Sequence, residues 1–278
     1  MSEKYELSLN VNSLRHLIGF SKYEACGNDF IIIDNRLGIF KPNRDSVSKL
    51  CDRNKGIGGD GLILLENEEN VDFKMSYFNS DGNLGSLCGN GSRCIAAFSK
   101  ELGIIENKAI FSAADGVHLA YIRGETIEVK MKDVVTIQKF GKDFFLDTGS
   151  PHYVRMVEKL SSYPVFEKGR EIRNQEPFSS NGGTNVNFIE YLDDHLWVRT
   201  YERGVENETL SCGTGVTAAA LVCSLYSPEE IKENCKIKTK GGNFSVKFHL
   251  EKEKFTNIWL SGPARCSFKG SFDLENFT

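Results

Sequence analysis

The sequence has 278 residues, 40% of them hydrophobic and 26% charged, so it is long enough for two domains of ordinary size, or one large one, with buried cores. The formal net charge of −4 argues against a nucleic-acid partner, and the longest apolar run, residues 218–223, is too short to span a membrane. Residues 1–20 carry no apolar signal-peptide stretch, so we expect a cytoplasmic protein whose eight cysteines are reduced.

Short runs of β-branched and aromatic residues, many of them bounded by Gly, Asn or Asp, predict a chain rich in strands. In chain order the predicted strands are 30–33, 62–65, 73–78, 118–122, 126–131, 188–192, 196–201, 244–250 and 257–260. Helices are fewer: 45–52 is a weak candidate, 92–102 ends before Gly103, and 216–226 is apolar nearly all round, as in a buried helix. Strands and helices do not alternate steadily, which argues against a Rossmann sheet.

An internal repeat runs through the chain. Cys88-Gly-Asn-Gly recurs 124 residues later as Cys212-Gly-Thr-Gly, and each is preceded by a tyrosine eleven residues earlier and followed by an apolar helix. The pair Gly58-Gly59 recurs at the same shift, and the segment 27–31 faces 150–154 at a shift of 123. These pairs predict two halves derived from one ancestral unit, with a boundary near residues 135–141.

Residues 56–61 match the pattern G-x-G-x-x-G, which in a nucleotide-binding fold follows a strand and begins a helix. Here a polar segment precedes the glycines and the apolar run 62–65 follows them as a predicted strand. We therefore reject the nucleotide interpretation and expect a loop whose backbone closely approaches another part of the chain.

The two Cys-Gly-x-Gly turns carry the best candidate chemistry. Each opens a predicted helix, where free backbone N–H groups and the helix dipole favour an anion and lower the pKa of a thiol. One such turn alone is more simply explained by a buried structural cysteine. Two such turns at duplicate positions suggest that both halves present a thiol to one cleft. No H-E-x-x-H, paired C-x-x-C or other metal-ligand spacing is present, so we expect no metal and no cofactor.

Two facing thiols can act as an acid and base pair. One thiolate removes a proton from carbon and the opposite thiol returns a proton to the other face, which inverts a stereocentre. For the weakly acidic α-proton of an amino acid, the two helix N-termini would stabilise the carbanion-like state at the carboxylate.

Several motifs together resemble the diaminopimelate epimerase family over nearly the whole chain, from about residue 20 to 264. They are Gly27-Asn-Asp-Phe, Asp81-Gly and 88–94, Gly149-Ser-Pro-His, Tyr201-Glu-Arg-Gly and Cys212-Gly-Thr-Gly. The resemblance implies an α/β (α+β) fold of two similar pseudo-duplicated domains, each a β-barrel-like sheet around a central helix, with the active site in the cleft between them. It further implies a homodimeric, PLP-independent enzyme that interconverts LL- and meso-2,6-diaminopimelate for lysine and peptidoglycan-precursor synthesis.

The resemblance also implies domain limits and roles for residues. The first domain would span 17–137 and the second 138–263, with residues 264–278 returning to the first; residues 1–16 would be an extension to which we assign no function. Cys88 and Cys212 match the catalytic pair. The implied substrate contacts are Gly89, Asn90, Gly213 and Thr214 at the reacting carboxylate, Asn28, Asn79, Asn185, Glu202 and Arg203 chiefly at the distal end, and Ser150 and His152 in the second half.

Two positions depart from the family pattern: Gly61 stands where many members carry Gln, and Ser150 where many carry Asn. Three alternatives stay open from the sequence. They are an epimerase or racemase of another amino acid such as proline or hydroxyproline, a non-catalytic amino-acid-binding protein of the same fold, and a redox module that joins Cys88 and Cys212 in a disulfide.

Overall fold

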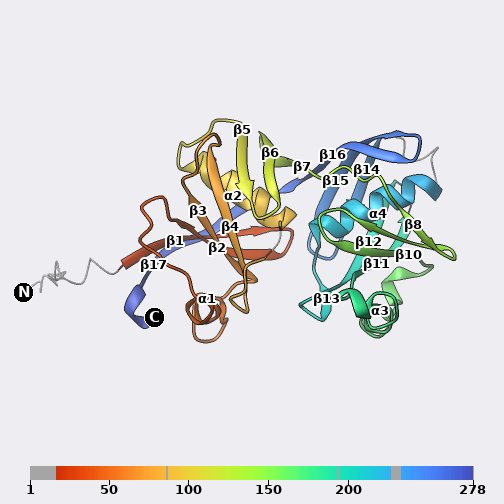
Figure 1. Ribbon diagram of the computed structural model, residues 1–278, viewed down its shortest axis with the longest axis horizontal. Coiled ribbons are helices and arrows are strands. Elements are labelled where there is room, and N and C mark those ends of the chain that lie inside the picture. The colour runs from red at the N-terminus through yellow and green to blue at the C-terminus, as the bar shows by residue number, and fades with distance from the viewer. Residues whose placement is uncertain (1–16, 86, 193, 227–232, 278) are drawn as a thin grey trace, which may run out of the picture.

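The computed structural model describes residues 17–85, 87–192, 194–226 and 233–277, so the predicted extension 1–16 lies outside the described residues. They form seventeen strands and four α-helices, arranged as two lobes that lie side by side (Figure 1). Within these ranges no helix is long and apolar enough to cross a membrane.

The first lobe is a strongly curved sheet. Its strands are β1 (Leu17–Ala25), β2 (Asn28–Asp34), β3 (Gly61–Glu66), β4 (Phe73–Asn79), β5 (Lys108–Ala113), β6 (Gly116–Arg123) and β7 (Thr126–Lys130). β2 runs parallel to β3, and β4 runs parallel to β5. The other neighbours pair antiparallel: β1 with β2, β3 with β4, β5 with β6, and β6 with β7. Two helices belong to this lobe, α1 (Arg44–Cys51) and α2 (Gly89–Glu101).

The second lobe repeats this order. Its strands are β8 (Gln138–Phe140), β9 (Asp143–Asp147), β10 (Pro151–Met156), β11 (Asn185–Leu192), β12 (His195–Glu202), β13 (Asn207–Thr209), β14 (Asn234–Lys238), β15 (Asn243–Glu251) and β16 (Lys254–Pro263). β10 runs parallel to β11, and β12 runs parallel to β14. β11 pairs antiparallel with β12, β14 with β15, and β15 with β16. Its helices are α3 (Val165–Arg173) and α4 (Gly213–Tyr226), with short 3-10 turns η2 (Leu160–Ser162) and η3 (Ser179–Asn181).

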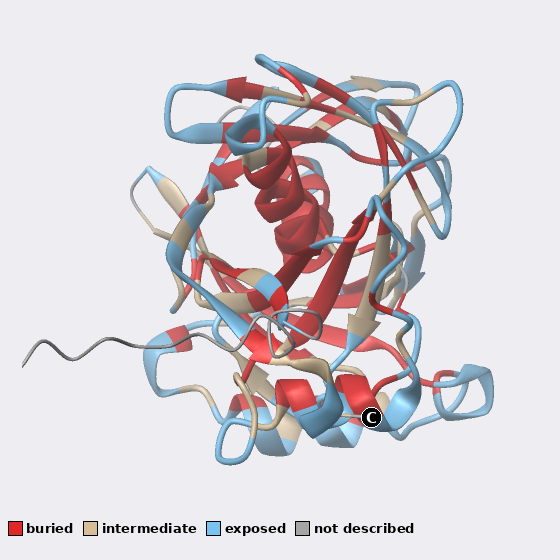
Figure 2. Cartoon of the chain, turned by 90° about the vertical axis from the view of Figure 1, so that its left-hand side faces the viewer, coloured by how far each residue is buried: buried red, intermediate tan, exposed pale blue. Residues whose placement is uncertain are grey.

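The repeat predicted from the sequence is present in the topology. β2, β3, β4, α2, β5, β6 and β7 correspond in order and pairing sense to β10, β11, β12, α4, β14, β15 and β16. In each lobe the long helix is surrounded by strands, and Figure 2 shows the buried helix inside the ring. The predicted fold of two duplicated α+β units, each a curved sheet around a central helix, is therefore confirmed.

Local sequence explains where the helices begin and end. Asn43 caps α1 through a reciprocal pair of hydrogen bonds with Ser46. Cys88 is the N-cap of α2, where its Sγ accepts a hydrogen bond from the Gly91 N–H. The same helix ends at Glu101, with Leu102 as its C-cap, before Gly103 with φ of +71°.

Three groups of buried apolar side chains hold the fold together. The largest surrounds α2 and α4 and includes stacked Phe73 and Phe111, whose ring centroids lie 5.2 Å apart. A second lies beneath α1 and a third beneath α3. Because α4 is apolar on all sides, with residues 216 and 218–223 all buried, the second sheet can close around it completely.

The two lobes are joined twice by strand pairing. β16 pairs antiparallel with β7, and the chain then continues into β17 (Arg265–Asp273), which pairs with β1 of the first lobe and ends in η4 (Leu274–Asn276). The last strand thus ties the C-terminal segment to the first lobe. The domain limits at residues 137 and 263 stay predictions.

All nine predicted strands and all three predicted helices are present, within a few residues at their ends. The prediction missed β1, β5, β8, β9, β10, β13, β14 and β17, and the helix α3. The glycine loop 56–61 runs directly into β3, as expected, and its backbone is tightly packed, because a Cβ on Gly56 would lie 2.1 Å from the Lys49 carbonyl oxygen.

A close approach of backbones between the lobes predicts the effect of one substitution. A Cβ on Gly241 would lie 1.8 Å from the Cys26 carbonyl oxygen, whereas a Cβ on Gly19 has open space. We expect Gly241→Ala to lower the free energy of unfolding by about 1–3 kcal/mol or more, as overpacking does, and Gly19→Ala to change it by less than about 1 kcal/mol. Urea unfolding of both variants measures this; equal effects would contradict the close approach.

Candidate active site

A cavity of about 410 Å³ lies between the two lobes, where the first turns of α2 and α4 meet. Every site residue predicted from the sequence lines it except His152. The residues that line it are Asn28, Tyr77, Asn79, Leu84, Gly85, Leu87, Cys88, Gly89, Asn90, Ser150, Asn185, Glu202, Arg203, Gly204, Ser211, Cys212, Gly213 and Thr214. Seven separate segments of the chain therefore converge on one site.

The two helix N-termini are in direct contact. A Cβ on Gly89 would lie 3.6 Å from the Gly213 Cα, and a Cβ on Gly213 would lie 3.3 Å from the Gly89 Cα. The first turn of each helix has N–H groups with no intrahelical acceptor, and both first turns line the cavity. Two positive helix ends at one place favour an anion there.

Cys88 lies at the start of α2. Its Sγ accepts a hydrogen bond from the Gly91 N–H at 3.4 Å and lies 3.8 Å from Asn28 Oδ1. Burial raises the pKa of the Cys88 thiol to about 11, although the N–H groups of Gly91 and Asn90 lower it.

Cys212 occupies the corresponding place before α4 and is buried. Its Sγ lies 3.5 Å from Thr214 Oγ1. Burial raises the pKa of this thiol too, with a further contribution from the Glu202 carboxylate, against opposing hydrogen bonds from Thr214 and the Gly215 backbone.

The predicted net lowering of the pKa of both thiols is therefore wrong, because both values are raised overall. The N–H groups act in the predicted direction, but removal of the thiolate from water outweighs them.

Behind Thr214 lies a chain of buried hydrogen bonds. His152 is fully buried; its Nε2 lies 2.8 Å from Thr214 Oγ1 and 3.1 Å from Ser150 Oγ, and Asn187 Nδ2 lies 3.1 Å from its Nδ1. Burial, and then the charge of Arg203, lowers the pKa of His152 to about 3, so its ring is neutral. His152 does not line the cavity, and it can reach a ligand there only through Thr214 or Ser150.

A second chain of hydrogen bonds lies on the side of the cavity formed by Asn28 and Asn90, and it connects the two lobes. Asn28 Nδ2 donates to Asp60 Oδ2 at 2.6 Å, which leaves Asn28 Oδ1 to accept from Asn90 Nδ2 at 3.2 Å. Asn90 Nδ2 also lies 3.2 Å from Ser211 Oγ, and Ser211 Oγ in turn donates to the Cys26 carbonyl at 2.7 Å. These bonds connect residues beside Cys88 with the residue that precedes Cys212.

Arg93 fixes the first turn of α2 from behind. Its guanidinium group is 0% exposed and donates to the Gly89 carbonyl at 3.2 Å, to Asn90 Oδ1 at 2.9 Å and to the Pro263 carbonyl at 3.3 Å. It also lies over the ring of Phe244, with its Cζ 5.0 Å from the centroid. Arg93 thereby ties α2 to the end of β16.

A second group of polar side chains lies at the end of β12. Glu202 accepts a hydrogen bond from Thr209 Oγ1 at 2.8 Å, and burial raises the pKa of its carboxyl group to about 7. Asn185 accepts from the Arg203 N–H at 2.9 Å and donates to Ser150 Oγ at 3.2 Å. The cavity thus holds a carboxylate, a guanidinium and amides beside the two thiols, a set suited to a ligand that carries both amino and carboxylate groups.

Sequence reasoning missed several residues of the site. Tyr77, Leu84, Gly85, Leu87, Gly204 and Ser211 line the cavity, and Asn187 supports His152. Tyr77 had one available signal, its place in the internal repeat. In the described part of the chain, no group of three or more His, Cys, Asp or Glu residues is placed to hold a metal ion.

Comparison with known proteins gives concordant results. The family model described as diaminopimelate epimerase matches residues 20–137 and 144–266. A protein named diaminopimelate epimerase from Flavobacterium psychrophilum is 48% identical over 251 residues, covering 89% of this chain and 97% of that protein. One of the same name from Aquifex aeolicus is 39% identical, covering 92% and 98%.

Solved structures with low sequence identity share the fold. A phenazine biosynthesis protein of the PhzF family from Bacillus anthracis aligns with a TM-score of 0.74 at 16% identity, covering 92% of this chain and 99% of that one. A hydroxyproline epimerase from Agrobacterium vitis aligns with a TM-score of 0.65 at 14% identity, covering 94% and 93%.

The raised pKa of Glu202 predicts a pH dependence of stability. Between pH 4.5 and about 7 the folded protein keeps a proton on Glu202 that the unfolded chain has lost, so stability is greatest below this window and falls as pH rises through it. The variant Glu202→Gln has no titrating carboxyl group at this position. We expect the free energy of unfolding of the wild type, relative to the variant, to fall by up to about 3 kcal/mol across the window. Urea titrations over this pH range measure it, and a constant difference would contradict the buried carboxyl group.

Proposed function

The chain belongs to the diaminopimelate epimerase family, and we propose that it interconverts LL- and meso-2,6-diaminopimelate by moving the α-proton between Cys88 and Cys212. The observation that carries the proposal is the pair of cysteines at equivalent helix N-termini of the two lobes, both on one cavity. The reaction is an isomerisation that serves lysine and peptidoglycan-precursor synthesis.

In the proposed reaction the α-carboxylate lies at the first turns of α2 and α4, against the N–H groups of Gly89, Asn90, Gly213 and Thr214. The thiolate of one cysteine takes the α-proton, the electron pair of the broken C–H bond passes towards the carboxylate, and the helix N-termini stabilise the charge that develops there. The thiol of the other cysteine then gives its proton to the opposite face of the carbon. The stereocentre is inverted, one proton has been taken and one given, and the two sulfurs have exchanged protonation states.

The buried thiols are consistent with this use of the cavity. Because both pKa values are raised, a thiolate forms at a cost that must be met when substrate binds. The ammonium group of an amino acid beside the thiols favours the thiolate, since an opposite charge within about 4–6 Å stabilises the ionised form. Glu202, ionised above about pH 7, can pair with an ammonium group as well.

We assign chiefly the distal end of the substrate to Asn28, Asn79, Asn185, Glu202 and Arg203. Ser150 lines the same cavity, and His152 acts through Thr214. Arg203 can bind a carboxylate bidentately and Glu202 an ammonium group. A cyclic amino acid such as proline offers no second amino-acid end to this group. The set therefore supports diaminopimelate over the proline and hydroxyproline alternatives.

We further propose that the protein works as a homodimer in the cytoplasm. Most of β17 is exposed, including Phe268, which is 50% exposed, so this strand offers a free surface to a second copy. All eight cysteines are free thiols, as in a reducing compartment. Thiol chemistry at Cys88 and Cys212 needs the same conditions.

Incubation of each epimer in deuterated water under reductant tests the function. We expect the wild type to incorporate deuterium at the α-carbon with inversion, and Cys88→Ala and Cys212→Ala each to abolish epimerisation, because inversion needs an acid on one face and a base on the other. The double variant should lose no more than either single one. Cys266→Ala, outside the cavity, is the control and should retain activity. Inversion by either single variant at the wild-type rate would refute the two-thiol mechanism.

The distal group predicts a separate effect on specificity. Arg203→Ala leaves both thiols and both helix N-termini in place but removes a bidentate donor to a carboxylate, so kcat/KM for diaminopimelate should fall at least about tenfold. Wild type should ignore alanine, proline and lysine, because they leave polar groups of the site unpaired. The measurement is kcat/KM for these amino acids and diaminopimelate in both proteins. If the wild type turned over proline as well as diaminopimelate, the diaminopimelate assignment would be wrong, and the protein would be a racemase of another amino acid.

A further inference from the structure

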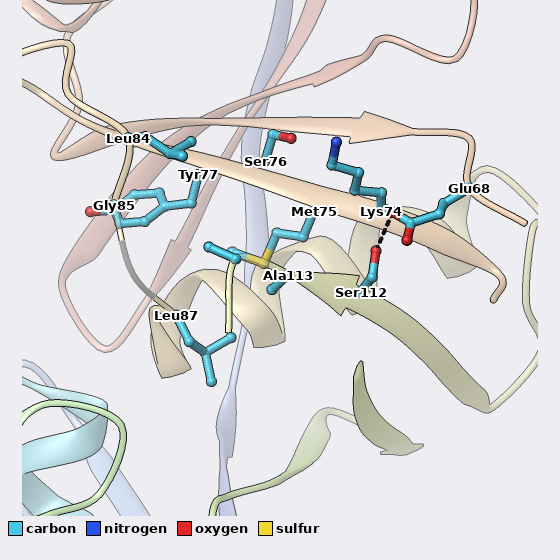
Figure 3. Close-up of a pocket in the computed structure, with 11 residues that line it drawn as sticks. Glu68, Lys74, Met75, Ser76, Tyr77, Leu84, Gly85, Leu87, Ser112 and Ala113 are labelled. Carbon is cyan, nitrogen blue, oxygen red and sulfur yellow. Dashed lines mark hydrogen bonds between the residues drawn. The ribbon is translucent and has the colours of Figure 1, made fainter. Parts of the chain in front are cut away.

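Tyr77, on β4, forms part of the wall between two cavities. One is the catalytic cavity, and the other is a neighbouring hollow of about 430 Å³ beside β4 and β5, shown in Figure 3. The residues common to both linings are Tyr77, Leu84, Gly85 and Leu87. The tyrosine therefore borders the space in which the substrate would lie, although nothing in the sequence motifs assigns it a role.

The ring of Tyr77 is fixed between two glycines. A Cβ on Gly61 would lie 2.6 Å from its Cε2, and a Cβ on Gly85 would lie 2.5 Å from its Cε1 and Cδ1. The ring of Phe30 meets it edge to face, with centroids 5.9 Å apart. No side chain fits at position 61 or 85 without displacing the ring, so the backbone on both sides is shaped to hold a tyrosine here.

The hydroxyl group of Tyr77 differs from those of three other packed tyrosines. Tyr23, Tyr153 and Tyr201 each donate a hydrogen bond to a carboxylate, from Glu101, Asp143 and Glu206 respectively. Tyr77 has no hydrogen-bond partner among the described residues, although its ring is enclosed. Because no buried side-chain oxygen or nitrogen of the described residues lacks a partner, this hydroxyl is accessible from the space outside the protein and can be reached by a ligand.

The surroundings keep this phenol protonated. Burial, and then the negative charges at Cys88, Glu202 and Asp60, raise the pKa of Tyr77 well above its usual range. Two of these groups, Cys88 and Glu202, line the catalytic cavity. Tyr77 also shares a face of β4 with Asn79, two residues away, which lines the same cavity. The hydroxyl is thus an unpartnered donor on a residue that lines the same cavity as the thiols and the polar end of the site.

We propose that Tyr77 is a substrate-contacting residue whose hydroxyl group donates a hydrogen bond to a carboxylate oxygen of the bound amino acid. The proposal rests on the proposed function and adds a contact to it. A carboxylate is the acceptor that Tyr23, Tyr153 and Tyr201 bind, and diaminopimelate carries two. The contact would add a neutral donor to a cavity whose lining includes only one cation, Arg203, among the described residues.

Tyr77→Phe tests the proposal because it removes only the hydroxyl group and leaves the ring between Gly61 and Gly85. Tyr153→Phe is the matched control: it removes a buried hydroxyl outside the cavity, and Arg155 still pairs with Asp143 there. For Tyr77→Phe we expect the Kd of diaminopimelate, measured by calorimetry, and its KM to rise about tenfold, with kcat changed less than threefold and the unfolding midpoint unchanged. Tyr153→Phe should leave Kd and KM as in the wild type.

The outcomes separate this inference from the proposed function. If the wild type turns over diaminopimelate but Tyr77→Phe binds it as tightly as the wild type does, the contact is refuted and the function stands. If the wild type binds diaminopimelate without epimerising it, the function fails, and the ratio of the two Kd values still decides the contact. Absence of binding to the wild type overturns both. Equal losses of affinity in the two variants would refute a specific role for Tyr77.

Discussion

The direct contact between the first turns of α2 and α4 is the constraint on which the rest of the structure depends. Helix N-termini carry like partial charges and would not be expected to meet, so their approach has to be enforced by packing elsewhere. Glycine at positions 89 and 213 permits the approach, since a side chain at either would lie against the other helix and Leu260. Strand pairing of β7 with β16 and of β17 with β1, together with buried Arg93, holds the lobes in this position.

The same packing sets the chemistry of the two sulfurs. Burial that brings the helix ends together also removes water from Cys88 and Cys212, and this raises their pKa values more than the N–H groups lower them. An ion placed in such a cavity interacts more strongly with fixed dipoles than it would in water. The site is therefore unfavourable for an isolated thiolate and favourable for an anion that the helix N-termini reach directly, as a carboxylate would be.

The sequence predicted those strands and helices whose residues form a recognisable pattern along a short stretch of chain. The strand 62–65 is a continuous apolar run, and the strand 196–201 is rich in aromatic and β-branched residues. The internal repeat placed Cys88 and Cys212 at equivalent helix starts, so their position on one cavity was predicted from the sequence. β1 and β17 were missed because they are mixed in polarity and are defined by pairing with each other across the whole chain. α3 was missed because its charged sequence is helical through packing on β11 and β12. The burial of the thiols, the position of His152 behind Thr214 and the free hydroxyl of Tyr77 all depend on contacts between distant segments.

The duplicated lobes have diverged in the residues that surround the two helix N-termini. Tyr77 and Tyr201 occupy repeat positions, yet Tyr201 is 1% exposed and bonded to Glu206, whereas Tyr77 borders the cavity without a partner. β4 ends at Asn79 and β12 at Glu202, so the two walls present an amide and a carboxylate to the same space. Symmetry of the helix ends suits a reacting carbon that must be reached from both faces. The walls around the helix N-termini lack this symmetry and carry different polar groups, so the motifs repeat while their neighbours do not.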